Sequence, residues 1–134
     1  MVENFGTLLL RSAADDAAAC RTLAAAPGMA DTVVGFHAQQ ACEKCLKVVL
    51  GHAAINYPRT HDLLRLMQLL RENGIELPAD TQWIDELMPY AVNARYGLVG
   101  IGGLDRDRAL AAVDALLAWA RDFTQTAAPP APPV

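Results

Sequence analysis

Residues 32–52 constrain the fold more than any other segment, because apolar side chains recur there around most of a helix. When successive residues are placed about 100° apart, the apolar ones cover more than half of the circumference. They are Val34, Ala38, Ala41, Cys42, Cys45, Leu46, Val48 and Val49. A helix this apolar needs neighbours on several sides, so the segment is predicted to be the central helix of a bundle.

Four further segments have apolar residues at helical spacing and are separated by glycine, proline or polar residues. Helices are predicted at about 5–25, 61–73, 81–94 and 106–124. The predicted N-caps of the five helices are Asn4, Asp31, Thr60, Asp80 and Asp105. Pro89 is expected to kink or split the fourth helix, because proline lacks the amide hydrogen that a helix interior needs.

The predicted fold is all-α: an antiparallel up-and-down bundle of four to five helices formed by residues 1–126. Apolar residues make up 53% of the chain but aromatic residues only 6%, and alanine and leucine are strong helix formers. Residues 95–104 are a glycine-rich connection that lacks the Lys-Ser/Thr pair of a phosphate-binding loop. Residues 127–134, rich in proline and alanine, are expected to be a disordered tail.

The overall charge and the cysteines limit the classes of function. A net charge of −4 argues against a domain that coats nucleic acid through bulk charge, although a local basic site is compatible with it. No leader and no apolar run of about 18 residues is evident, so a cytoplasmic protein without a membrane span is expected. Cys42 and Cys45 form a Cys-x-x-Cys pair in mid-helix on the apolar arc, which favours buried structural cysteines over a redox or zinc site. No metal or cofactor is expected.

The remaining arc of residues 32–52 is polar. It carries His37, Gln40, Glu43, Lys44 and Lys47. The two lysines are the only ones in the chain, against nine arginines elsewhere. One interpretation is a solvated helix face in which Glu43 and Lys47 form an i, i+4 pair. The other is a binding site, because cationic and amide groups suit phosphates and base edges.

Residues 36–47, Phe-His-Ala-Gln-Gln-Ala-Cys-Glu-Lys-Cys-Leu-Lys, resemble the signature of HEPN domains. In that family a Thr-His-Asp-Leu motif follows after a loop, which here begins at Thr60, directly after Arg59. An Arg-Tyr pair, here Arg95 and Tyr96, follows the fourth helix. Residues 9–16, Leu-Leu-Arg-Ser-Ala-Ala-Asp-Asp, are similar to the first helix of the family. The resemblance covers residues 5 to about 124.

The resemblance implies a helical bundle, a homodimer and association with a minimal nucleotidyltransferase, in some cases within a toxin–antitoxin system. It also implies a binding site for a nucleotide or RNA. The expected ligand-binding residues are His37, Gln40, Glu43, Lys44, Lys47, Arg59, His61, Arg95 and Tyr96. Without the resemblance, the sequence predicts that His61 is a surface residue in the first turn of a helix.

An alternative function is that of a metal-independent ribonuclease acting as a dimer, with Arg95 and His61 as the candidate catalytic residues. Family ribonucleases use an arginine followed four to six positions later by a histidine. None of the three histidines, His37, His52 and His61, has an arginine at that distance before it. The resemblance therefore supports the fold and the class of partner more than it supports catalysis.

Overall fold

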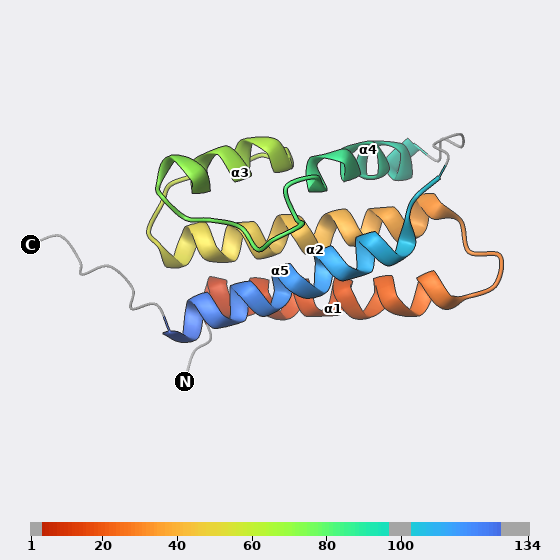
Figure 1. The fold of residues 1–134 in the computed structure, drawn as a ribbon, viewed down its shortest axis with the longest axis horizontal. Helices are drawn as coiled ribbons and strands as arrows, with labels where there is room; N and C mark the ends of the chain where they lie inside the picture. Colours follow the sequence, from red (N-terminus) through yellow and green to blue (C-terminus); the bar gives the residue numbers. More distant parts are fainter. Residues whose placement is uncertain (1–3, 97–102, 127–134) are drawn as a thin grey trace, which may run out of the picture.

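The computed structural model describes residues 4–96 and 103–126, and the side chains of residues 4–92 and 103–125. These residues form α1 (Phe5–Ala25), α2 (Asp31–His52), α3 (Leu63–Glu72), the 3-10 helix η1 (Ile84–Leu87), α4 (Met88–Tyr96) and α5 (Arg106–Thr126) (Figure 1). No strand occurs in these parts of the chain, so the fold is all-α as predicted. The predicted tail, residues 127–134, and most of the glycine-rich connection lie outside the described residues.

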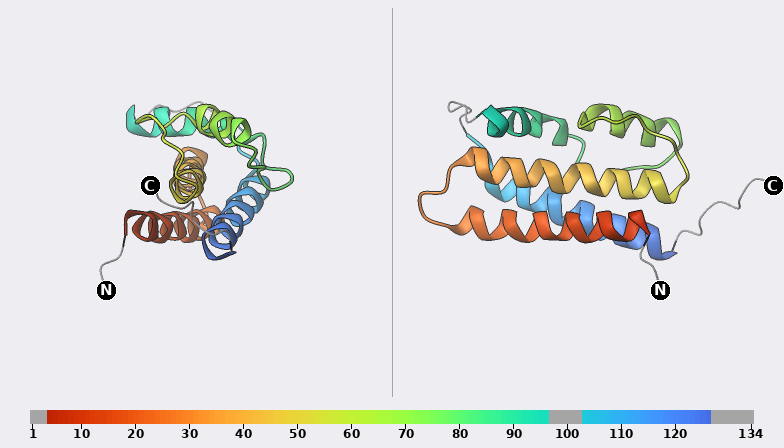
Figure 2. Two further views of the ribbon diagram at one scale, coloured as in Figure 1. Left: turned by 90° about the vertical axis from the view of Figure 1, so that its left-hand side faces the viewer. Right: turned by 180° about the vertical axis from the view of Figure 1, so that it is seen from behind.

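Helix α2 lies at the centre of the bundle, as its apolar arc predicts. Seen end-on, α1 and α5 lie on one side of α2, while α3 and α4 lie on the other, one after the other along its length (Figure 2). Helix α2 contacts each of the other helices. All eight apolar residues predicted for its buried arc are at most 2% exposed, which confirms the prediction.

Small side chains let α1 and α5 approach α2 closely. The buried residues of α1 are Ala13, Ala17 and Cys20. On α5 the predicted seam is confirmed, because Ala109, Val113, Leu116 and Ala120 are buried and Phe123 packs at the edge of the core. Within the described residues no helix is both long and apolar enough to cross a membrane.

Two of the predicted N-caps are confirmed. The side chain of Asn4 accepts a hydrogen bond from the amide of Thr7, and that of Asp105 accepts one from the amide of Arg108. At the other end of a helix, Gly74 has a φ of 73° and follows the C-cap Asn73 of α3. A left-handed glycine in this position ends a helix without steric strain.

Three other predicted caps are wrong. Asp31 lies inside α2 after the N-cap Ala30, because its carboxylate binds the amide of Leu104 and the guanidinium of Arg106 instead. The cap of α3 is Asp62, not Thr60, whose hydroxyl accepts from the amide of Asp62.

Asp80 does not cap a helix either. Its φ is 62°, and the regular structure begins later, with η1. Helix α4 then starts at Met88, so Pro89 occupies its first turn, where the missing amide hydrogen has no partner to lose. The predicted fourth helix is thus split close to its proline, and Arg95 and Tyr96 end α4 rather than starting the connection.

Candidate functional site

The polar side chains of α2, which we call the polar stripe, are His37, Gln40, Glu43, Lys44 and Lys47. Two carboxylates hold the stripe in place, and the first of them is Asp16 on α1. Its Oδ2 atom accepts a hydrogen bond from Nζ of Lys44 at 2.5 Å, and its Oδ1 atom lies 3.1 Å from Nδ1 of His37. The side chain of Asp16 is 14% exposed and that of Lys44 is 22% exposed. Asp16 therefore fixes His37 and Lys44, which are about two helical turns apart on α2, against α1.

Glu43 is the second carboxylate, and it is almost completely buried, with 4% exposure. It accepts hydrogen bonds from Nζ of Lys47 and from Nε2 of the Gln39 side chain, each at 3.1 Å. Nδ1 of His61 lies 3.1 Å from both of its oxygens. A buried carboxylate is costly unless it is paired, so these donors are what allow Glu43 to sit under the surface.

The Glu43 contacts also place the loop between α2 and α3. His61 lies in that loop, just before α3, and the buried Gln39 amide reaches the backbone carbonyl of His61 at 3.4 Å. Gln40 lies beside it and donates to the Gln39 side-chain oxygen at 2.7 Å. Nδ1 of His61 is engaged by Glu43, so Nε2 is the ring nitrogen that remains for another partner, on a side chain that is 56% exposed.

A pocket of about 420 Å³ opens where α1, α2 and this loop meet, and we call it the cationic pocket. Its lining includes the acidic and basic residues Glu43, Lys44, Lys47, Arg59 and His61. Arg59 is exposed and forms no ion pair within the described part of the chain. Lys44, Lys47 and Arg59 bring three positive charges to this region, whereas Glu43 and Asp16, which binds Lys44, bring two negative charges. The region is therefore locally positive on an acidic chain.

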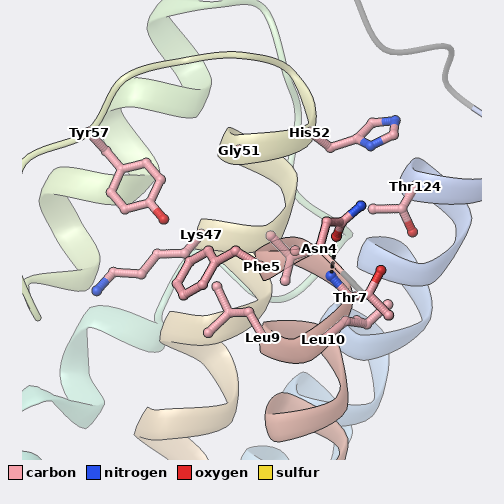
Figure 3. A pocket seen from close by; sticks show the side chains of 12 residues that line it. Asn4, Phe5, Thr7, Leu9, Leu10, Lys47, Gly51, His52, Tyr57 and Thr124 are labelled. Atoms are coloured by element: carbon pink, nitrogen blue, oxygen red, sulfur yellow. Dashed lines mark hydrogen bonds between the residues drawn. The ribbon is translucent and has the colours of Figure 1, made fainter. Parts of the chain in front are cut away.

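A second hollow, of about 580 Å³, adjoins the first, and we call it the apolar pocket. The two pockets share Phe5, Leu9, Lys47 and Tyr57. Figure 3 shows Phe5 and Leu9 of α1 on one side and Tyr57 on the other, with the Lys47 side chain beside them. His52 and Thr124 line its far end.

The shared residues are positioned by specific contacts. Nζ of Lys47 lies 5.9 Å from the ring centroid of Tyr57, close enough for a cation–π interaction. Burial raises the pKa of the Tyr57 phenol above its ordinary value, so the hydroxyl stays protonated and able to donate. Phe5, in contrast, is 70% exposed, which is unusual for a phenylalanine and leaves its ring accessible.

The family model of the HEPN domain matches residues 8–123. The chain belongs to the HEPN domain family. No curated protein and no solved structure matches the chain. The match covers α2, α3, η1 and α4 completely and all but the outer ends of α1 and α5, so the stripe on α2 lies within the HEPN domain.

The HEPN domain brings together most of the predicted ligand residues. Glu43, Lys44, Lys47, Arg59 and His61 line one pocket, while His37 and Gln40 lie along the same stripe without lining it. The backbone of Arg95 and Tyr96 forms the end of α4, but their side chains lie outside the described residues. The stripe is not a freely solvated face, because its acidic residue is buried and its lysines are mostly covered.

Sequence reasoning missed four residues of this site. Asp16 and Gln39 tie the stripe to its neighbours, and Phe5 and Tyr57 line both pockets. A signal was present for Asp16, which follows the buried Ala13 by three positions and precedes the buried Cys20 by four. A carboxylate at that spacing lies near the buried face of α1, where it needs a cationic partner.

The cysteines are structural, as predicted. Cys20, Cys42 and Cys45 are buried free thiols. Among the described residues, no group of three or more His, Cys, Asp or Glu side chains is arranged to hold a metal ion. The lining side chains of the cationic pocket offer charge and hydrogen-bond donors and acceptors.

Proposed function

We propose that this HEPN domain is a binding and regulatory module that holds the phosphates of a nucleotide in the cationic pocket. The observation that carries the proposal is the gathering of Lys44, Lys47 and Arg59 around one opening of an acidic chain. Charge-assisted hydrogen bonds from such groups are the strongest polar contacts that a phosphate makes. Nε2 of His61 adds a further group at the same edge.

The arrangement of the lysines favours a specific site over a general anion surface. Lys44 and Lys47 are each held by a carboxylate, so their ammonium groups are fixed in place before a ligand arrives. A fixed donor loses little conformational entropy on binding. Arg59, with no ion pair among the described residues, supplies the charge that is not already neutralised.

Calorimetry with ATP and the substitutions Lys44→Ala, Lys47→Ala and Arg59→Ala tests this site. Each substitution should weaken binding several-fold, and Arg59→Ala should leave the fold intact because Arg59 is exposed. Arg65→Ala is the matched control, since Arg65 lies on α3 and contacts Glu72 rather than the pocket. Equal affinity of ATP for the wild type and all three pocket variants would refute the location.

The proposed module acts through a partner, a minimal nucleotidyltransferase, in a system of the toxin–antitoxin type. Two observations support this proposal: membership of the HEPN family, and the absence from the sequence of the arginine–histidine spacing of the family's ribonucleases. Co-expression with a nucleotidyltransferase from the same genome, followed by affinity purification of the tagged HEPN domain, provides the test. No complex at micromolar concentrations would count against the partnership while leaving nucleotide binding open to its own test.

A metal-independent ribonuclease is the second candidate function, and one specific observation favours it. His37 and His61 each direct Nδ1 at a carboxylate, Asp16 and Glu43 respectively, which orients the other ring nitrogen outward. A carboxylate-oriented histidine is a common general acid or base, and Arg95 would stabilise charge on the phosphate.

Incubation of purified protein with mixed RNA distinguishes this candidate from a pure binding module. A ribonuclease would lose cleavage in His61→Gln, His37→Gln and Arg95→Ala, whereas contaminating activity would persist in all three. Cleavage that is equal in the wild type and the variants would remove the ribonuclease hypothesis.

A further inference from the structure

The two adjoining pockets differ in chemistry along their length. The cationic pocket is lined by Lys44, Arg59 and His61, none of which reaches the apolar pocket. Among the described residues, Lys47 is the only lysine or arginine that lines the apolar pocket, and none of the aspartates or glutamates of residues 4–96 and 103–126 lines it. One end of the combined hollow is therefore suited to phosphates and the other to an uncharged, flat, apolar group.

The junction between the two pockets is flanked by two aromatic rings. Phe5 comes from the first turn of α1 and Tyr57 from the loop after α2, and both line both pockets (Figure 3). Asn4, His52 and Thr124 contribute polar atoms around the apolar pocket. Aromatic side chains with a few polar groups are what ligand sites use to stack and orient a ring.

We propose that a nucleoside phosphate lies across the junction, with its base in the apolar pocket against Phe5 and Tyr57 and its phosphates in the cationic pocket. This orientation rests on the proposed function, because it assumes that the cationic pocket binds phosphate. It explains why a 70% exposed phenylalanine stands at the rim of a hollow, since stacking on a base would cover the ring. Lys47, at the junction and over the Tyr57 ring, is placed to contact the phosphate nearest the nucleoside.

Three probes separate the two halves of the site: ATP, adenosine and inorganic tripolyphosphate. In Phe5→Ala and Tyr57→Ala, the affinity for ATP should fall about tenfold, as expected for the loss of a base–aromatic stack. The affinity for tripolyphosphate should fall by less, and in Tyr57→Ala only as far as the lost contact with Lys47 affects the phosphate site. In Arg59→Ala, the affinities for ATP and tripolyphosphate should fall together. Adenosine should bind more weakly than ATP and should lose binding in the two aromatic variants.

Leu8→Ala is the matched control for Phe5→Ala. Leu8 also lies in the first turns of α1 and is 47% exposed, but it lines neither pocket. Both residues are exposed enough for their substitution to leave the fold intact, and Tyr57→Phe retains the ring if Tyr57→Ala is poorly folded. In NMR spectra, the ring resonances of Phe5 should shift with ATP and adenosine but not with tripolyphosphate.

The results of these experiments distinguish the proposed orientation of the ligand from the proposed binding of phosphate. If ATP and tripolyphosphate both bind but Phe5→Ala and Tyr57→Ala change neither, the phosphate site stands and the base site is wrong. If the aromatic variants weaken tripolyphosphate as much as ATP, the rings support the pocket rather than stack on a base, and the inference again fails. If neither ATP nor tripolyphosphate binds the wild type, the proposed function and the orientation both fall.

Discussion

The thiols of Cys20, Cys42 and Cys45 show how burial, as the main cause, lowers the reactivity of a cysteine. Burial raises the pKa of Cys20 to about 11 and that of Cys45 to about 12. It also raises the pKa of Cys42 well above its ordinary value. The thiolate is the reactive form, and at a pH below these pKa values almost none is present.

We therefore expect the native protein to be inert to a disulfide reagent such as Ellman's reagent near pH 8. After unfolding in guanidinium chloride, all three cysteines of the chain should react, because their pKa values return to the ordinary range. The release of the coloured thiolate measures both. Rapid reaction of even one thiol in the folded protein would contradict the burial described here.

Glu43 is the residue on which most contacts of the site depend. Replacing it by glutamine keeps the shape but removes the charge that pairs with Lys47 and His61. We expect Glu43→Gln to lower the free energy of unfolding by roughly 1–3 kcal/mol, since hydrogen bonds to a buried charged group are weakened. Chemical denaturation of the variant and the wild type measures the difference.

Glu72→Gln provides the control for this prediction. Glu72 is exposed and lies 3.9 Å from Arg65, so its loss should change the stability by less than about 0.5 kcal/mol. A Glu43→Gln effect no larger than that of Glu72→Gln would show that the buried network contributes little.

At this scale the sequence predicts some of the site and not the rest. The Glu43–Lys47 pair follows from a spacing of four on one helix, so it was predictable. The contacts of Asp16 with Lys44 and of Gln39 with the His61 carbonyl join different segments. Such contacts depend on how the helices are rotated against one another, which local spacing does not contain.

Helices α2 and α4 cross where Gly35 meets Tyr90, and this contact sets their separation. A Cβ atom added to Gly35 would lie 2.4 Å from both Cγ and Cδ1 of Tyr90. Tyr90 is itself 5% exposed and has little room to move. We expect Gly35→Ala to destabilise the protein by about 1–3 kcal/mol, because the helices must separate or the ring must turn.

Gly51→Ala on the same helix is the matched comparison. No atom lies within 4 Å of a Cβ placed there, so the substitution should stabilise α2 by up to about 0.5–1 kcal/mol through helix propensity. Thermal unfolding of the two variants should therefore give shifts of opposite sign. Shifts of the same sign would mean that the α2–α4 contact is looser than described.

The caps show which element boundaries a sequence can predict. Asn4 and Asp105 cap their own helices, and within the described residues each side chain accepts only from an amide in the first turn of that helix. Asp31 also directly precedes a predicted helix, but its carboxylate accepts a hydrogen bond from the Arg106 guanidinium. The same guanidinium also donates to the carbonyls of Ala24 and Met29. A cap is lost wherever a distant segment supplies a better partner.

For the molecule as a whole, the central place of α2 followed from its apolar arc, whereas the two pockets did not follow from any pattern. They form where the start of α1, the second half of α2, the loop before α3 and the end of α5 meet. The start of α1 and the end of α5 lie far in sequence from α2 and the loop that follows it, yet they lie close to them in space (Figure 1). Their juxtaposition is a consequence of the bundle topology, which both the five helical segments with short connections and the HEPN resemblance predicted, but neither predicted which side chains would line the hollows.

The exposed apolar side chains bear on whether the protein assembles into a dimer. Five large apolar side chains are at least 38% exposed in the described part of the chain: Phe5, Leu8, Val33, Leu64 and Val92. Val92 lies on α4, three residues before Arg95, so an interface that covers it would bring the ends of two copies of α4 together. In a two-fold dimer, residues near the axis meet their own copies, and Arg95, Tyr96 and the His61 loop would then line a site shared by two protomers.

We expect light scattering to give twice the chain mass of 14.4 kDa, and Val92→Glu to reduce it to a single chain, because a charge at the centre of an apolar interface is costly. Leu64→Glu is the matched control, since Leu64 is 44% exposed but lies on α3. If two protomers share the site, Val92→Glu should also abolish any activity that depends on Arg95, although the side chain of Val92 has no functional group that could take part in it. A wild-type mass of one chain at working concentration would overturn the dimer. A dimer unaffected by Val92→Glu would place the two-fold axis elsewhere, and Arg95 would then act within one protomer.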